Sequence, residues 1–97
     1  MDYAPPDGRF KGKQFVFTGE MTFLGREEAC EIVVAQEGCT SNSVSKKTHY
    51  LVVGEEALRA FKRNREKTGK LARAVEIQEA GGFVQIIGAP DFLKMIR

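Results

Sequence analysis

Hydrophobic residues in this 97-residue chain occur in short, dense runs that polar and glycine-containing stretches separate. The run Phe15–Phe17 is apolar at every position, and the stretch HYLVV at 49–53 is nearly so. A strand that is buried on both faces, as in a parallel sheet, has this continuous pattern instead of an alternating one. The same kind of pattern predicts four strands in all. They cover residues 13–19, 39–41, 49–53 and 83–87.

Three other segments have the spacing of helices. From Arg26 to Gln36 the apolar residues recur at close to helical intervals, and Gly38 suits the end of that helix. A second helix is expected over residues 70–82, where two consecutive glycines terminate it. A short helix closes the chain over residues 88–97, with Pro90 in its first turn.

The segment between residues 55 and 69 is highly charged and only weakly periodic. Ala57, Leu58 and Phe61 fit one apolar face of a short helix, which breaks at Thr68-Gly69. The order of elements is therefore β-α-β-β, this variable segment, and then α-β-α. That order predicts a small α/β sandwich with a parallel sheet of about four strands.

Length and composition fit one small globular domain, with 42% hydrophobic and 29% charged residues. We assign this domain to residues 10–97, and residues 1–9 to a flexible leader or linker. No apolar run approaches the ~20 residues that cross a bilayer, and the N-terminus lacks the apolar centre of a signal peptide, so an intracellular protein is expected. Cys30 and Cys39 fit a reducing compartment, where we expect them to be buried or half-buried thiols.

Charge is unevenly distributed, although the net charge is only +2. Residues 59–70 contain six basic residues and one acidic residue, and Lys46 and Lys47 form a second basic pair. Residues 25–38 are acidic at most of their polar positions. The domain is expected to be electrostatically two-sided, with a basic face that suits phosphate groups.

Five stretches of the sequence together resemble the BRCT family. They are GKQFVFTGEM, REEACEIVVAQEG, SVSKKTHYLVVG, GKLARAVEIQEAGGFVQII and DFLKMI, and the resemblance runs from Phe10 to Arg97. The third stretch carries it most strongly and is similar to BRCT domains of bacterial NAD-dependent DNA ligases and of the large subunit of replication factor C. The resemblance implies a BRCT-like three-layer sandwich, in which three helices flank a four-stranded parallel sheet of order 2-1-3-4.

This chain departs from the family pattern at two places. Many BRCT domains carry a tryptophan in the last helix, and here Phe92 takes that position, as in the ligase-type members. The connection over residues 55–68 is longer than usual in the family.

The resemblance also implies a phosphate site. In phosphate-binding members, a Ser or Thr at the end of the first strand, the N–H of the following glycine and a lysine at the start of the second main helix hold one phosphate. These positions match Thr18, Gly19 and Lys70, and Arg26 matches a further basic position of a DNA-binding relative. Such groups donate charge-assisted hydrogen bonds beside a helix dipole. Taken alone, however, Thr18-Gly19 fits an ordinary strand exit better than a phosphate site, and only Lys70 makes the two interpretations even. Arg26 fits a solvated first-turn residue equally well.

Six more basic residues are candidates for contact with a DNA backbone. They are Lys46, Lys47, Lys62, Arg63, Arg65 and Lys67. The alternative interpretation is a solvated turn for the first two and a solvated loop for the others. We interpret His49 as a strand-edge residue instead of a base or metal ligand, because no cysteine or carboxylate cluster accompanies it.

No catalytic motif supports an enzyme, and the enzyme alternative is a small phosphatase-like or nucleotide-using protein with Thr18-Gly19 as its anion loop. The predicted function is a non-catalytic module of DNA replication or repair that recognises the 5′-phosphate of a DNA end or nick. The alternative is a protein-interaction module, phosphopeptide binding included, without DNA contact.

The expected partners are therefore DNA or a replication or repair protein, with no cofactor, no metal and no membrane. We expect a monomer, in the bacterial cytoplasm at the nucleoid or in a nucleus. The sequence leaves open whether the domain is free or part of a ligase, an exonuclease or a clamp-loader subunit.

Overall fold

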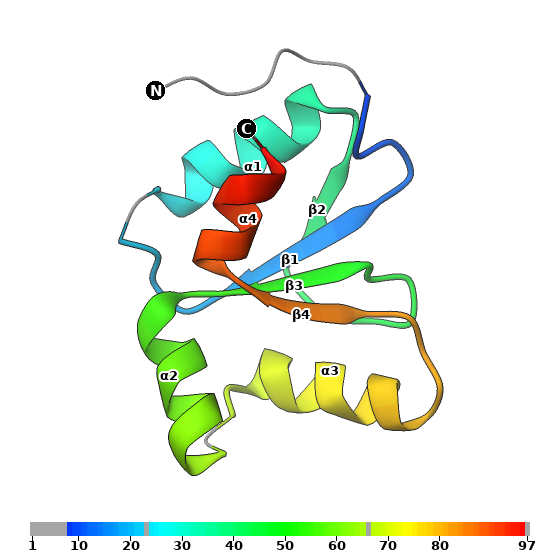
Figure 1. Ribbon diagram of the computed structural model, residues 1–97. Coiled ribbons are helices and arrows are strands. Elements are labelled where there is room, and N and C mark those ends of the chain that lie inside the picture. The colour runs from blue at the N-terminus through cyan, green and yellow to red at the C-terminus, as the bar shows by residue number, and fades with distance from the viewer. Residues whose placement is uncertain (1–7, 23, 66, 97) are drawn as a thin grey trace.

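The computed structural model describes residues 8–22, 24–65 and 67–96 and contains one four-stranded parallel sheet in the order β2-β1-β3-β4 (Figure 1). The strands are β1 (Gln14–Thr18), β2 (Cys39–Ser41), β3 (Tyr50–Val53) and β4 (Gln85–Gly88). The helices are α1 (Arg26–Ala35), α2 (Glu55–Asn64), α3 (Gly69–Glu79) and α4 (Ala89–Met95). The predicted sheet and its strand order are confirmed. Residues 1–7 of the predicted leader lie outside the described residues.

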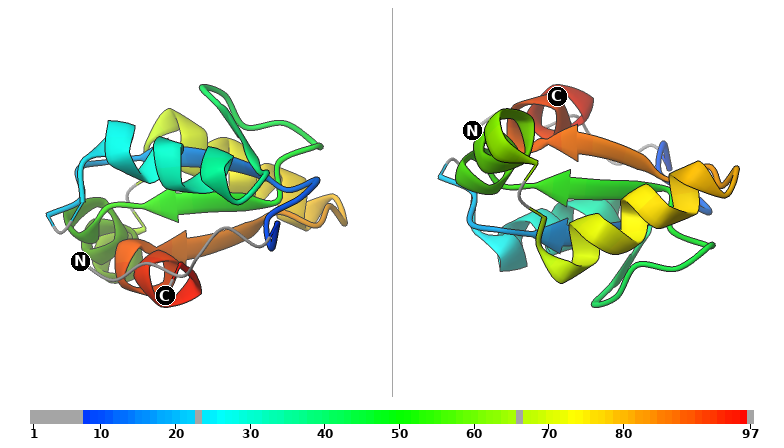
Figure 2. Two further views of the ribbon diagram at one scale, coloured as in Figure 1. Left: turned by 90° about the horizontal axis from the view of Figure 1, so that it is seen from above. Right: turned by 90° about the horizontal axis from the view of Figure 1, so that it is seen from below.

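Alternation along the strands divides the hydrophobic core into two clusters, one on each face of the sheet. Phe15 and Phe17 belong to the cluster under α1 and α4, whereas Val16 belongs to the cluster under α3. Seen from above, α1 and α4 lie over the strands, and seen from below, α3 crosses them (Figure 2). The molecule is thus a three-layer sandwich.

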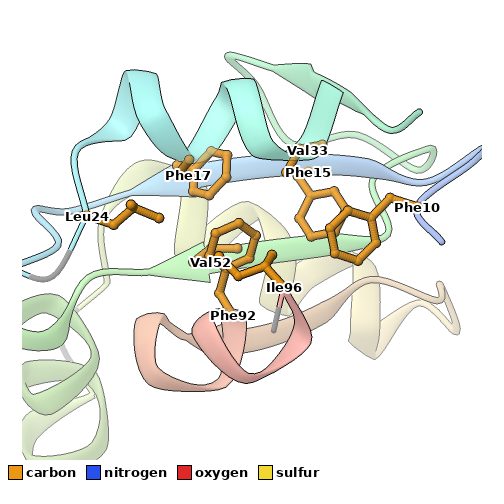
Figure 3. Packing of buried hydrophobic residues seen from close by; sticks show 9 residues of the cluster. Phe10, Phe15, Phe17, Leu24, Val33, Val52, Phe92 and Ile96 are labelled. Atoms are coloured by element: carbon orange, nitrogen blue, oxygen red, sulfur yellow. The ribbon is translucent and has the colours of Figure 1, made fainter. Parts of the chain in front are cut away.

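Aromatic rings fill the face under α1 and α4 (Figure 3). Phe92 of α4 is fully buried, and its ring meets Phe15 and Phe17 edge-on, with centroids 5.8 and 5.4 Å apart. The ring of Phe10 lies 4.8 Å from that of Phe15. Such tilted and edge-to-face pairs are favourable beyond the apolar area they bury. Phe92 therefore anchors the last helix to the sheet.

The opposite face is covered by the apolar stripe of α3. Leu71, Ala74 and Ile77 are its buried residues, and they pack against Leu51 and Val53 of β3. Their spacing of three residues keeps them on one side of the helix. This packing fixes the start of α3 close to the end of β1.

The structure adds a helix to the three that the family resemblance implied. In α2 no residue is fully buried, but Ala57, Leu58 and Phe61 are half-buried against the cluster under α3. Its first turn is acidic and its last turn basic, which suits the helix dipole. The charged residues that weaken the helical periodicity of this segment therefore also stabilise the helix.

Two local predictions were wrong. The last strand begins at Gln85 and not at Phe83, because its partner strand begins at Tyr50, the residue that pairs with Gln85. Cys30 is half-buried as predicted, but Cys39 is exposed, because it begins the edge strand β2.

All four strands run in the same direction, so their carboxyl ends share one edge of the sheet, on the left in Figure 1. We call this the carboxyl edge and the opposite one the amino edge. The helices α1, α2 and α3 all begin at the carboxyl edge. None of the helices in the described chain is long and apolar enough to span a membrane.

Candidate functional site

The first strand ends at the carboxyl edge with Thr18 and Gly19. Thr18 is buried, and its hydroxyl donates a hydrogen bond to the Thr68 hydroxyl at 3.1 Å. Gly19 has a φ of 78°, and a Cβ there would lie 3.0 Å from the Cβ of Ala57. Glycine is therefore favoured at this turn by both its conformation and its close neighbour. Within the described part of the chain, the Gly19 N–H donates no hydrogen bond.

Lys70, in the first turn of α3, reaches across to the end of β1. Its ammonium donates a hydrogen bond to the Phe17 carbonyl at 2.9 Å, although the two residues are 53 positions apart. Burial, and after it the positive charge of Arg26, lowers the pKa of Lys70 from its ordinary value of 10.5. The lysine is thus held in place beside Thr18, where its charged form is disfavoured.

Thr68 links these groups and was not predicted from the sequence, which marked it only as a break. Its hydroxyl oxygen caps α3 by accepting the Leu71 N–H at 3.1 Å, and it also accepts the Thr18 hydroxyl. A threonine three residues before the first buried residue of a helix is a recognisable N-cap signal. That signal gives the cap, but it does not give the contact with Thr18.

Arg26 lies on the other side of Gly19. It is the first residue of α1, is exposed, and donates from Nη2 to the Gly19 carbonyl at 3.4 Å. Its charge is close enough to lower the pKa of Lys70. Among the described residues, neither cation forms an ion pair with a carboxylate. The structure therefore brings all four predicted site residues to the carboxyl edge and leaves two like charges there uncompensated.

Four of the six further basic candidates lie from the last turn of α2 to the start of α3. Lys62 and Arg63 occupy the last turn of α2, and Arg65 and Lys67 follow in the connection to α3. All four are exposed. Lys67 lines a shallow depression with Thr68, and the Arg65 guanidinium lies 6.0 Å from the centre of the Phe61 ring.

Lys46 and Lys47 lie elsewhere. They form an exposed turn before β3, at the amino edge, and Lys46 lines a hollow with residues near the end of α3. From Gln14 to Thr18, the two ends of β1, the chain advances by roughly 13 Å, so the two edges are at least that far apart. These two lysines are therefore not part of the cluster around Thr18.

His49 and the cysteines take no part in this site. His49 directly precedes β3, and its Nδ1 accepts the Gln14 N–H at 3.0 Å, as expected of a strand-edge residue. In residues 8–22, 24–65 and 67–96, no group of three or more histidine, cysteine, aspartate or glutamate side chains is placed to hold a metal ion.

Comparison with known proteins identifies the family to which this fold and edge belong. The model of the BRCA1 C Terminus (BRCT) domain matches residues 5–87, and the chain belongs to the BRCT family.

Curated relatives with similar sequences are bacterial proteins named DNA ligase. That of Sulfurihydrogenibium sp. (strain YO3AOP1) is 42% identical over 89 residues, which are 92% of this chain and 11% of that protein. That of Acetivibrio thermocellus is 41% identical over 91 residues, which are 94% of this chain and 12% of that protein. The chain thus spans about an eighth of the length of these relatives or less. Among solved structures, the C-terminal BRCT domain of human XRCC1 superposes over 96% of this chain and 94% of its own, with a TM-score of 0.46 and 18% identity.

Proposed function

We propose that this BRCT domain is a non-catalytic module of DNA replication or repair that binds the 5′-phosphate of a DNA end or nick. Thr18, Gly19, Arg26 and Lys70 are the proposed phosphate ligands. The Thr18 hydroxyl turns from Thr68 towards the phosphate, since a hydroxyl proton rotates to suit its acceptor. The Gly19 N–H supplies a backbone donor, and the two cations supply charge.

The observation that carries this proposal is that Lys70 and Arg26 donate to the carbonyls of Phe17 and Gly19, the residues on either side of Thr18. Burial, and after it the positive charge of Arg26, disfavours the charged form of Lys70 and lowers its pKa. A bound phosphate offsets this repulsion and accepts charge-assisted hydrogen bonds, which are stronger than neutral ones. Perturbed ionisable groups of this kind are more frequent at functional sites than elsewhere.

A terminal phosphate suits the site better than an internal one. It carries a charge of about −1.5 to −2 near pH 7, whereas a phosphodiester in a chain carries one. Two cations and two neutral donors match the more highly charged group. The relatives named DNA ligase support the proposal that this phosphate belongs to DNA. A DNA ligand is consistent with an intracellular location.

The basic residues after α2 extend the proposed surface. These are Lys62, Arg63, Arg65 and Lys67, which are exposed and lead along the chain towards Thr68. In this proposal they contact the DNA backbone next to the terminal phosphate. Lys46 and Lys47 reach the same nucleic acid only if a strand passes from one edge of the sheet to the other.

The test is a binding titration with two duplexes that differ only in a 5′-phosphate. We expect the wild type to prefer the phosphorylated duplex, because each hydrogen bond to a charged group contributes roughly 1.5 to 3 kcal/mol. Lys70→Ala removes most of this preference. Thr18→Val acts in the same direction and keeps the β-branched shape in the strand.

Lys11→Ala is the matched control, because Lys11 is exposed and precedes β1 at the amino edge. It removes the same charge as Lys70→Ala but is expected to leave the preference for the phosphate intact. Equal affinity of the wild type for both duplexes contradicts the proposal.

A protein-interaction module is the second candidate, and the outer face of α1 favours it. Val34 is 59% exposed and lines an apolar depression with Cys30 and Ala35. An exposed apolar patch of this kind suits a protein partner better than DNA. Binding of a replication or repair protein that Val34→Asp abolishes, together with no duplex binding, would favour this candidate.

A further inference from the structure

Phe83 is an aromatic side chain at the amino edge that the proposed phosphate site does not use. It is 56% exposed and lies in the turn between α3 and β4. A single exposed apolar side chain is ordinary and by itself indicates nothing. The residues around Phe83 are what indicate a binding role.

The backbone on both sides of Phe83 is fixed. The Gly82 N–H donates to the Ile77 carbonyl at 2.8 Å, and a Cβ at Gly82 would lie only 2.3 Å from the Ile77 side chain. On the other side, the Gln78 amide donates to the Val84 carbonyl at 3.0 Å, and Val84 is buried. Phe83 is therefore presented to solvent from a rigid turn, which lowers the entropy that a ligand must remove on binding.

One side of the Phe83 ring rests on His49. The ring centroids are 4.8 Å apart and the planes are inclined by 38°. The imidazole is itself held, because its Nδ1 accepts the Gln14 N–H. Burial, and then the charge of Lys13, lowers the pKa of His49 from 6.5, so the ring is neutral at pH 7. The two rings form a fixed, uncharged aromatic surface.

Hollows lie on both sides of Phe83, and basic residues border them. One, of about 410 Å³, is lined by Lys46, Arg73, Glu76 and Ile77. The other, of about 230 Å³, is lined by Lys13 and His49. Glu76 is the acidic residue among these, and it pairs with Arg73 at 3.4 Å on the exposed surface. Within the described residues, Lys13 and Lys46 form no ion pair.

We propose that Phe83 and His49 form a stacking platform for an unpaired base of single-stranded DNA, whose flanking phosphates are neutralised by Lys13, Lys46 and Arg73. Aromatic rings set in a basic groove are the arrangement that binds single strands without reading their sequence. Bases in a duplex are stacked on one another and offer no free face, so the platform requires an unpaired strand. This contact is separate from the 5′-phosphate site at the carboxyl edge.

The charges around Phe83 favour nucleic acid over a protein partner. Val34, the other large apolar side chain exposed in the described chain, lies on α1 beside Glu31. Phe83 instead lies among lysine and arginine side chains. The two exposed apolar residues thus have surroundings of opposite charge, and only those of Phe83 complement phosphate.

The test uses fluorescence anisotropy with an oligothymidine of about 12 nucleotides that lacks a 5′-phosphate. A strand of the same length without bases is the comparison ligand. We expect the wild type to bind the oligothymidine more tightly than the abasic strand. Phe83→Ala should weaken oligothymidine binding by roughly 5- to 150-fold and barely change abasic binding, while Phe83→Tyr keeps the wild-type affinity.

Three controls make the result specific. Val34→Ala removes an equally exposed apolar side chain and should leave oligothymidine binding unchanged. Lys70→Ala should also leave it unchanged, and Phe83→Ala should leave the 5′-phosphate preference on blunt duplexes unchanged, so the two proposals can fail separately. The stacking platform would be overturned if the wild type did not bind oligothymidine or bound the abasic strand equally well. Wild-type affinity of Phe83→Leu for oligothymidine would also overturn it. Wild-type affinity with leucine would show that the contact needs apolar area and not an aromatic ring.

Discussion

Phe92 and Phe83 are the same residue type in opposite environments. Phe92 is fully buried between two other rings, whereas more than half of Phe83 is exposed. We expect Phe92→Ala to lower the free energy of unfolding by about 3–5 kcal/mol, and Phe83→Ala to change it by about 0.5 kcal/mol or less. Urea denaturation of both variants measures this. Similar losses for the two would mean that the core does not lie where α4 meets β1.

If Lys70 binds the phosphate as proposed, the binding should depend on pH. Its pKa is lowered in the free domain, and a bound phosphate favours the charged form, so affinity should fall as the pH rises through the pKa of Lys70. Affinity should also fall below about pH 6, where the terminal phosphate gains a proton. Titrations of the phosphorylated duplex from below about pH 6 to above the pKa of Lys70 measure both the acidic and the alkaline fall in affinity. An alkaline limb that persists in Lys70→Ala would assign the effect to another group.

The same shift has a defined sign for stability. A lysine whose folded pKa is lowered binds fewer protons in the folded state than in the unfolded state between that pKa and 10.5. Its unfavourable contribution is therefore complete below the folded pKa and is relieved as the pH rises through it. Arg26→Gln removes one cause and should raise the pKa of Lys70, which NMR titration of its side chain can follow.

At the scale of elements, a carboxylate ties the β1–α1 connection to α2. Glu55 accepts the Thr22 N–H at 3.0 Å and the Thr22 hydroxyl at 3.1 Å. Burial raises the pKa of Glu55, but the backbone hydrogen bonds at Glu55 and Thr22, the Thr22 hydroxyl and the charge of Arg59 together bring it below 4.5. The stabilisation by Glu55 is thus present above pH 4.5 and is lost as the pH falls through the lower folded value.

We expect Glu55→Gln to speed hydrogen exchange at the Thr22 amide, because the charge-assisted hydrogen bond is lost. Glu56→Gln is the control, since Glu56 is exposed and pairs with Arg59 on the same helix. Unchanged exchange at Thr22 in Glu55→Gln would show that other contacts hold the connection.

A helix or strand could be predicted from the sequence where residues within it determine its position. The apolar run of β1 and the helical spacing of α3 are local signals, and both elements formed where expected. The predicted start of β4 was wrong. Phe83 is a residue type that suits a strand, but β3 begins at Tyr50, which pairs with Gln85, so Phe83 has no partner in the sheet. A strand end set by a partner more than 30 residues away cannot be found from local pattern.

The site shows the same limit. No spacing rule joins Lys70 to Phe17, and their proximity was expected only from the family resemblance. The contact between Thr18 and Thr68 was missed because each residue has a complete local explanation, one as a strand exit and the other as a helix cap. Lys46 and Lys47 were grouped with the other cations by charge alone, whereas the direction of the strands puts them at the amino edge.

At the scale of the whole molecule, duplex binding should depend strongly on salt. Each phosphate contact adds about 0.9 to the slope of log affinity against log salt concentration. Replacing Lys62 and Arg63 together by alanine should reduce this slope for every duplex sequence, because backbone contacts do not read bases. Replacing Lys11 and Lys94 together removes the same charge away from this surface. An equal reduction in both double variants would indicate a general effect of net charge.

The most direct test of the proposed phosphate site is a map of backbone amide chemical shifts with two duplexes that are identical except for the 5′-phosphate. The difference between the two maps isolates the phosphate from every other contact. We expect this difference to be largest at Gly19 and to include Thr18, Thr68 and Lys70, because the Gly19 N–H is the proposed backbone donor. A difference that spares Gly19, or one confined to the outer face of α1, would contradict the account.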